Sequence, residues 1–318
     1  MMARLLLCCI AWAFGTTVHA QAFPTGPVKI VVSSPPGGGT DIIARLIAEK
    51  LRERWNQPVI IENRGGAAGN IGAEAVFHSP PDGYTLLLTA AQGPLVVNDM
   101  LYKMTFDPGK FVPVSLAAST PAILVVHPSV SASNVTELIA LAKAHPGKLN
   151  YASQGAGNSA HLMAEFFNER AGIETVHVPY KGTAPALAGL ISGDVQFLFG
   201  ELATSGPHVA AGKLRVLGVG SASQSPLVPG VPAIAETLPG FLAITWWGMV
   251  APPGTPPALA TKISQDVAAA LKQPDVAKKF ADLSIEPIGG SPAELTAFIA
   301  KEREQWGKVI RRAGIQVN

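Results

Sequence analysis

Short apolar runs alternate along this chain with segments in which apolar residues recur at helical spacing. The β-branched run at 28–32 is typical of a buried parallel strand. A glycine-rich break at 35–39 follows, and the apolar residues of 42–51 then recur on one helical face. Further strands are predicted at 59–61 and 84–88. Because strands separated by helices require crossover connections, the pattern predicts an α/β fold with a doubly wound sheet.

A second unit with the same plan begins near Pro121. Asn134 and Glu137 form a capping signal at the start of a helix that runs to about Ala144, where the His-Pro-Gly sequence at 145–147 ends it. The unit therefore repeats the alternation of strand and helix seen in the first part of the chain. The strands expected in it are 123–126, 149–153, 176–178, 195–199 and 214–219.

The two units predict two lobes, each a sheet flanked by helices, with a ligand cleft between them. We expect residues 21–121 together with 246–318 to form the first lobe and residues 122–245 to form the second. Two closing helices, one from Pro256 and one across 292–312, carry apolar stripes that indicate core packing. Since clefts between lobes are favoured ligand sites, this organisation places the binding site at the crossings.

The N-terminus has the features of a secretory signal. A positive charge at Arg4 precedes the apolar run 5–14, and 18–20 is a small-x-small cleavage sequence. We expect removal of residues 1–20 with cleavage near Ala20, and hence a periplasmic protein. The chain's only cysteines, Cys8 and Cys9, lie in the segment to be removed, so the mature chain has no disulfide or thiolate chemistry.

Composition and charge exclude several classes of partner. The formal net charge is +2, and removal of Arg4 leaves about +1, so no basic surplus indicates nucleic acid. After the signal, no apolar stretch reaches spanning length, which argues against direct membrane insertion. Charged residues make up only 14%, while the chain has 32 glycines and 27 prolines, a composition typical of a compact α/β protein with many tight turns.

Two glycine-rich loops, at 36–41 and 155–159, each lie between a predicted strand and a predicted helix. Glycine lets backbone N–H groups approach a ligand, and a helix N-terminus adds free donors and partial positive charge. Loops of this kind from opposite lobes could hold an anion, with the hydroxyls of Thr40 and Ser159 as further donors. Taken alone, each loop is explained equally well as a turn whose glycines are needed for positive φ. Neither matches a Walker or dinucleotide motif.

The remaining polar candidates are weaker. Lys181, in a Pro/Gly turn, is a possible partner for a carboxylate and equally a solvated lysine, and Asp41 is best placed to interact with a helix dipole. Ser159 and His161 lack the nucleophile elbow and third partner that a hydrolase needs, so we predict no catalytic residue. The histidines show no metal-ligand spacing, and no cofactor or metal is expected.

Taken together, the ordered motifs of this chain resemble those of the tripartite tricarboxylate transporter substrate-binding proteins, the Bug or TctC-like receptors. The similarity spans nearly the whole mature chain. It rests on 36–41 (Pro-Gly-Gly-Gly-Thr-Asp), 62–72 (Glu-Asn-Arg-Gly-Gly-Ala-Ala-Gly-Asn-Ile-Gly), 82–87 (Asp-Gly-Tyr-Thr-Leu-Leu), 153–162 with its spaced glycines, 178–182 (Val-Pro-Tyr-Lys-Gly), 247–256 and the helix around Trp306.

The resemblance implies a type II-like Venus-flytrap fold that closes on a small mono- or dicarboxylate, with aromatic carboxylates among the possible ligands. It implies that the protein then presents the ligand to membrane permease subunits. It also implies that the protein is not an enzyme, and we expect a monomer. The alternative is a sensor that presents a bound carboxylate to a signalling partner. The candidate ligand residues are Ser34, Pro36, Gly37, Gly38, Thr40, Ala91, Gln92, Gly155, Gly157, Asn158, Ser159, His161, Lys181 and Thr183.

Two departures from the family pattern fall near the expected pocket. Ser33 and Ser34 stand where relatives often have Pro-Phe, and 89–94 (Thr-Ala-Ala-Gln-Gly-Pro) differs from the usual Gly-Thr-His-like run. The missing aromatic leaves a larger or more polar space. The identity of the carboxylate is therefore the open question.

Overall fold

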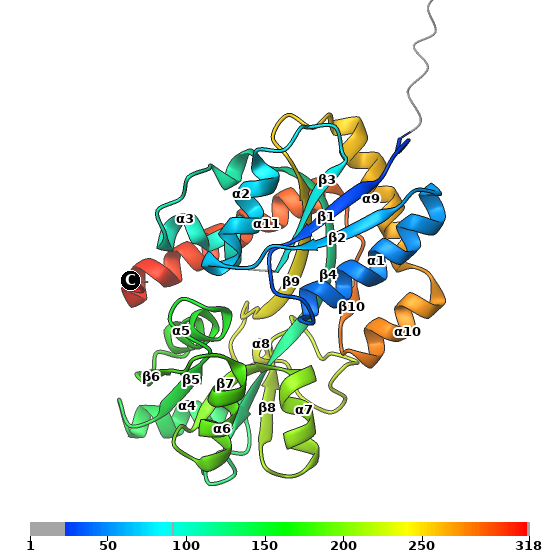
Figure 1. Ribbon diagram of the computed structural model, residues 1–318. Coiled ribbons are helices and arrows are strands. Elements are labelled where there is room, and N and C mark those ends of the chain that lie inside the picture. Colours follow the sequence, from blue (N-terminus) through cyan, green and yellow to red (C-terminus); the bar gives the residue numbers. More distant parts are fainter. Residues whose placement is uncertain (1–22, 91, 317–318) are drawn as a thin grey trace, which may run out of the picture.

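The computed structural model describes residues 23–90 and 92–316. The predicted signal peptide and the candidate Ala91 lie outside these residues. The described chain folds into two lobes, shown one above the other in Figure 1 and named here the upper and the lower lobe. Each lobe is a sheet flanked by helices, which confirms the predicted fold class.

The upper lobe is built on a mixed sheet in the order β2-β1-β3-β9-β4. β1 is parallel to β2 and β3, whereas β9 is antiparallel to both β3 and β4. The strands are β1 (Val28–Val32), β2 (Val59–Asn63), β3 (Thr85–Ala90), β4 (Val112–Val126) and β9 (Ile244–Ala251), with the two-residue β10 (Glu286–Pro287) beside β4.

Helices cover both faces of the upper sheet. One apolar cluster joins the sheet to α1 and α9, and the other joins it to α2 and α11. The helices of this lobe are α1 (Gly39–Trp55), α2 (Asn70–Phe77), the short α3 (Asn98–Leu101), α9 (Pro257–Leu271), α10 (Pro274–Asp282) and α11 (Pro292–Ala313). Single turns occupy Ala67–Gly69, Gly93–Val97 and Pro108–Lys110.

The lower lobe continues from the far end of β4. Its strands are β5 (Asn150–Ser153), β6 (Val176–Pro179), β7 (Phe197–Glu201) and β8 (Arg215–Val219), and its helices are α4 (Val135–Ala144), α5 (Ser159–Ala171), α6 (Thr183–Ser192), α7 (Leu202–Ala210) and α8 (Ile234–Thr237). The expected cap of α4 is present, because Asn134 Oδ1 accepts a hydrogen bond of 2.9 Å from the Glu137 N–H.

One long strand joins the lobes. β4 is a single strand of fifteen residues that pairs with β9 in the upper lobe and with β7 and β8 in the lower lobe. The sequence predicted a strand only at 123–126, which is wrong in its start, because β4 begins at Val112. Proline cannot donate to a ladder, so each proline in this strand must stand where no such bond is needed. Here Pro113 borders a register shift and Pro121 stands where the strand changes partners.

Three backbone segments meet where β4 leaves the upper sheet. The Ala122 N–H donates to Ala243 O at 3.0 Å, the Ala243 N–H to Gly220 O at 2.8 Å, and the Gly220 N–H to Ala122 O at 2.7 Å. A Cβ on Gly220 would lie 2.2 Å from Ala243 O, so only glycine permits this approach. The junction is therefore tightly specified.

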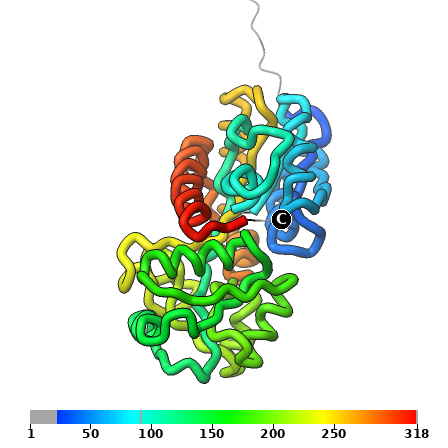
Figure 2. Tube along the Cα trace, turned by 90° about the vertical axis from the view of Figure 1, so that its left-hand side faces the viewer, coloured from blue at the N-terminus to red at the C-terminus, as the bar shows by residue number. Residues whose placement is uncertain are grey.

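The C-terminal helix α11 reaches from the upper lobe down to α5 of the lower lobe, as Figure 2 shows in red above green. Trp306 of α11 packs edge-on against Phe166 of α5 with ring centroids 5.8 Å apart. Arg312 and Glu169 form an ion pair along the same line. The lobes are thus in apolar contact on this side.

None of the helices within 23–90 and 92–316 is long and apolar enough to cross a membrane.

Candidate functional site

A cavity of about 250 Å³, here called the first cavity, lies where the two lobes face each other. Its walls come from the end of β1, the start of α1, the end of β3, the turn that follows, and the loop before α5. The lining residues are Ser33, Ser34, Thr40, Ala68, Thr89, Ala90, Gln92, Gly93, Pro94, Val97, Asn98, Tyr102, Ala156, Gly157, Asn158 and Ser159. No lysine, arginine, aspartate or glutamate lines it within the part of the chain that the structure describes.

The Thr40 hydroxyl already accepts one hydrogen bond from the protein. The Trp247 indole N–H donates to Thr40 Oγ1 at 3.1 Å, and both side chains are buried. The Thr40 proton is therefore available for a group in the first cavity. The N-cap of α1 is Gly38, which offers no side-chain cap. The first backbone N–H groups of α1 lack intrahelical partners and add donors beside this hydroxyl.

Asp41 holds the first glycine loop in shape. Its carboxylate accepts from the Gly37 N–H at 2.9 Å, from Asn63 Nδ2 at 3.0 Å and from Arg45 Nε at 3.0 Å. Burial alone would raise the pKa of Asp41, but the hydrogen bonds from Arg45, Gly37 and Asn63 outweigh it and lower the pKa. The Gly37 amide and the Asp41 carboxylate are thus engaged with each other in this structure.

The second glycine loop is held by two stacked histidines. The Gly157 N–H donates to His161 Nδ1 at 3.0 Å, which assigns the ring proton of neutral His161 to Nε2. The His161 and His177 rings stack 3.8 Å apart, and His177 Nε2 is 2.6 Å from Ser153 Oγ. The pKa of both histidines is lowered to about 4, mainly by burial, and for His161 the neighbouring His177 contributes to that lowering.

Gln92 connects the two lobes across the first cavity. Its Oε1 accepts from Ser159 Oγ at 2.8 Å, and its Nε2 donates to the carbonyl of Ile244 at 3.3 Å. The side chain is buried at 3% exposure. Gln92 therefore joins the turn after β3, the start of α5 and the start of β9 in one arrangement.

Ser34 contributes a hydroxyl without a partner. Its Oγ is buried and makes no hydrogen bond within the described residues. Its neighbour Ser33 instead donates to Thr89 Oγ1 at 2.7 Å. A buried polar atom without a partner is costly, and Ser34 lines the first cavity, so its hydroxyl is suited to a ligand.

A second cavity of about 390 Å³ adjoins the first and shares Asn158 and Ser159 with it. Its walls come from β4 and β9 where they cross between the lobes, from the end of β7 and from the starts of α5 and α6. Its lining residues are Ala122, Gln154, Asn158, Ser159, Ala160, Met163, Thr183, Phe199, Gly200, Glu201 and Thr245.

The candidates predicted from sequence fall into three groups. Ser34, Thr40, Gln92, Gly157, Asn158 and Ser159 line the first cavity, and Thr183 lines the second. Pro36, Gly37, Gly38, Gly155, His161 and Lys181 are not among the lining residues of either cavity. Ala91 lies outside the described residues. The binding roles of all these residues stay predictions.

Several lining residues of the first cavity were not predicted from the sequence. Asn98 and Tyr102 line the first cavity, and Asn98 Nδ2 also donates to Ala68 O at 3.0 Å and to Asn70 Oδ1 at 2.6 Å. They reach the cavity because 93–97 forms a wide helical turn, which no pattern in the sequence indicated. The only available signal was the polar Asn-Asp pair at 98–99 after an apolar run.

The geometry of Ser159 and His161 does not form a nucleophile–base pair in the described structure. The Ser159 hydroxyl donates to Gln92, and His161 Nδ1 accepts from a backbone amide. Among the described residues, no group of three or more His, Cys, Asp or Glu side chains could hold a metal ion.

Comparisons with known proteins identify the relatives of this chain. The family model described as the tripartite tricarboxylate transporter family receptor matches residues 43–315. A UPF0065 protein from the tcbD–tcbE intergenic region of Pseudomonas sp. (strain P51) is 38% identical, over 99% of this chain and 96% of its own.

Two solved structures are similar over almost their whole length. Rpa4515 of R. palustris with adipate has 37% identity and a TM-score of 0.78, covering 92% of this chain and 99% of its own. MatC (Rpa3494) from Rhodopseudomonas palustris with bound malate has 31% identity and a TM-score of 0.73, covering 91% of this chain and 100% of its own. The family is one of receptors and not of enzymes. A third similar structure is that of the periplasmic binding protein BugD, with 31% identity and a TM-score of 0.73, covering 92% of this chain and 99% of its own.

Proposed function

This chain belongs to the tripartite tricarboxylate transporter receptor family, and we propose that it captures a small carboxylate between its lobes and delivers it to membrane permease subunits. The observation that carries the proposal is the first cavity, whose described lining residues offer hydrogen-bond donors and include no lysine, arginine, aspartate or glutamate. Two neighbours whose structures contain adipate and malate support a carboxylate as the class of ligand.

A carboxylate is an acceptor-only group, and the first cavity supplies what it needs. The hydroxyls of Ser34 and Thr40 have protons without protein acceptors in the described structure. The N-termini of α1 and α5 border the cavity through Thr40 and Ser159, and a helix N-terminus carries partial positive charge. Neutral donors and bridging water can therefore hold an anion without a lysine or arginine.

Closure of the lobes fits the same proposal. We place the lobe boundaries at 21–121 with 246–318 and at 122–245, so that the chain crosses at the junction of Ala122, Gly220 and Ala243. The hydrogen bond from Ser159 to Gln92 would form only when the lobes are closed. We propose that the permease recognises this closed, monomeric form in the periplasm, after removal of the segment ending near Ala20.

A thermal-shift screen of the mature protein across mono- and dicarboxylates tests the function. A ligand present at 100 times its dissociation constant is expected to stabilise the protein by about 2.7 kcal/mol, because it binds only the folded state. Isothermal titration calorimetry would then give the affinity of each hit. Turnover of an ester without any stabilisation by a carboxylate would overturn the proposal.

The Thr40→Val variant is expected to weaken carboxylate binding at least about tenfold, because a hydrogen bond to a charged group contributes about 1.5 kcal/mol or more and 1.4 kcal/mol corresponds to a factor of ten. Valine has nearly the shape of threonine but lacks the hydroxyl that lies between Trp247 and the first cavity. Titration calorimetry on the purified variant measures the loss.

Thr40→Ser is the matched control, since it keeps the hydroxyl and should keep most of the affinity. Equal affinities of the valine and serine variants would show that the Thr40 hydroxyl makes no bond to the ligand.

A further inference from the structure

The second cavity differs from the first in one respect: it contains a charged side chain. Glu201 lines it, whereas its other polar lining residues are neutral amides and hydroxyls such as Gln154, Thr183 and Thr245. Across both cavities Glu201 is the only lysine, arginine, aspartate or glutamate among the described lining residues. Because the cavities share Asn158 and Ser159, one ligand could contact both.

Glu201 is held at the cleft by the fold around it. It is the last residue of β7, pairs with Ala122 of β4 across the sheet, and directly precedes α7. Glu201 keeps accessible surface where it lines the second cavity, although the surrounding walls keep most water away from its carboxyl group. Its pKa is raised by burial between those walls, and no hydrogen bond or ion pair from the described residues opposes that rise. The carboxylate thus faces the second cavity without a protein partner.

The sign of the charge decides what the second cavity can accept. Thr183 begins α6. The start of a helix carries a partial positive charge of about half an elementary charge, which favours an anion nearby. In its ionised form Glu201 carries a negative charge and accepts hydrogen bonds only. A second carboxylate placed beside Glu201 would repel the ionised form and raise its pKa further, whereas a hydrogen-bond donor would stabilise that form.

We propose that the far end of the ligand carries a hydrogen-bond donor, an ammonium or hydroxyl group, which Glu201 accepts in the second cavity. The ligand class is then an amino- or hydroxy-carboxylate, with its carboxylate in the first cavity. This inference rests on the proposed function, because it assumes that the first cavity holds the carboxylate.

Matched ligands test the inference on the mature protein at neutral pH. Succinate and adipate are titrated calorimetrically beside the ω-amino and ω-hydroxy acids of the same chain lengths. For the best chain length, a donor-terminated acid is expected to bind at least about tenfold more tightly than the dicarboxylate. A gain for both donor acids indicates recognition of the hydrogen bond, and a gain for the amino acid alone indicates recognition of its charge; either supports the proposal.

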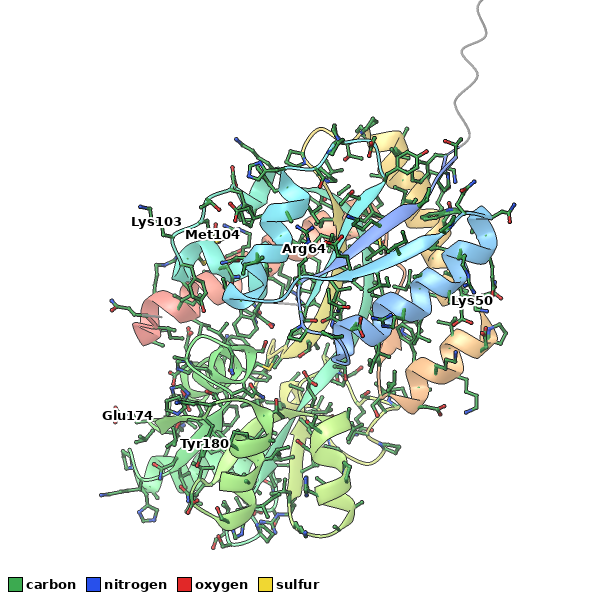
Figure 3. The ribbon with its side chains drawn as sticks, viewed as in Figure 1. Lys50, Arg64, Lys103, Met104, Glu174 and Tyr180 are labelled. Atoms are coloured by element: carbon green, nitrogen blue, oxygen red, sulfur yellow. The ribbon has the colours of Figure 1, made fainter. Side chains whose placement is uncertain are left out.

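The Glu201→Gln variant should reduce that preference at least about tenfold by removing the charge. Glu201→Asp keeps the charge and should keep the preference, which covers the case in which the glutamine variant fails to fold. Glu174→Gln is the matched control, since Glu174 is an exposed glutamate at the outer edge of the lower lobe, away from the second cavity (Figure 3). This control should bind every ligand as the wild type does.

Two outcomes would overturn the inference, and they are distinguishable. If the dicarboxylates bind at least as tightly as both donor-terminated acids, and Glu201→Gln leaves the ratio unchanged, the donor site is wrong while the proposed function stands. If no carboxylate of any class binds, the proposed function fails and the inference falls with it.

Discussion

Acidification from pH 7 to pH 4 is expected to remove about 3 kcal/mol of folding stability through His161 alone. Burial lowers the pKa of His161 from 6.5 to about 4, and each pKa unit corresponds to about 1.4 kcal/mol. Between these two pH values the unfolded chain binds a proton that the folded chain does not, so stability falls as the pH falls. The contribution is fully present above pH 6.5 and is lost as the pH approaches 4.

The same protonation should disturb the second glycine loop. A protonated His161 cannot accept the Gly157 N–H at Nδ1, and a charge on either ring would face the other histidine at 3.8 Å. On the other side His177 stacks on the ring of Tyr151, whose hydroxyl is bonded to Glu165. Ligand affinity is therefore expected to decline over the same pH range.

Denaturant unfolding at several pH values between 7 and 4 measures the effect. The double variant His161→Gln/His177→Gln should lose less stability on acidification than the wild type. His145→Gln removes an exposed histidine and should follow the wild-type curve. Carboxylates whose pKa is lowered, such as Asp41, also protonate on acidification. The stability that the protein loses through them is the same in all variants, so it does not affect the comparison. Parallel curves for the wild type and the double variant would refute a role for the stacked pair.

Glu302→Ala is expected to lower the free energy of unfolding by about 3–5 kcal/mol. The Glu302 carboxylate is 2% exposed, and its Oε2 accepts the indole N–H groups of both Trp246 and Trp306 at 2.9 Å. Both indoles are fully buried, so alanine leaves two donors without partners as well as a cavity. Each unsatisfied buried donor costs about 1–3 kcal/mol, which makes the combined loss large.

The Glu302→Gln variant separates the hydrogen bonds from the charge. Burial raises the pKa of Glu302, although the hydrogen bonds from the two indoles act to lower it. A raised pKa in the folded state stabilises the protein at low pH, and this contribution is lost as the pH rises through the raised pKa. Glutamine keeps an acceptor oxygen without the buried charge and is expected to cost less than about 1.5 kcal/mol.

Urea unfolding at neutral pH, with the slope checked for two-state behaviour, gives the required free energies. Glu304→Ala is the surface control, because Glu304 is exposed on the same helix and pairs only with Lys308 at the surface. A loss below about 1 kcal/mol in Glu302→Ala, or an equal loss in Glu302→Gln, would contradict the account of the indole pair.

Local patterns in the sequence predicted much of the architecture. The alternation of apolar runs and helical stripes indicated two α/β units, and the expected helix across 292–312 is observed as α11 (Pro292–Ala313). The glycine-rich stretches at 36–41 and 155–159 do lie between strands and helices. These features depend on residues a few positions apart, which is why periodicity, caps and glycine reveal them.

The partners of the site residues were decided only by the tertiary structure. Gln92 meets Ser159 across 67 positions and Ile244 across 152, and Glu201 reaches the cleft because β7 ends beside β4. The sequence marked Gln92 as part of a departure from the family pattern but contained no sign of its partners, and it left Glu201 unmarked. Which chemical groups converge depends on packing between distant segments, and no short pattern encodes that packing. The sequence by itself therefore determined the elements and the two-lobed plan, while the folded chain decided which donors line the first cavity and that Glu201 lines the second.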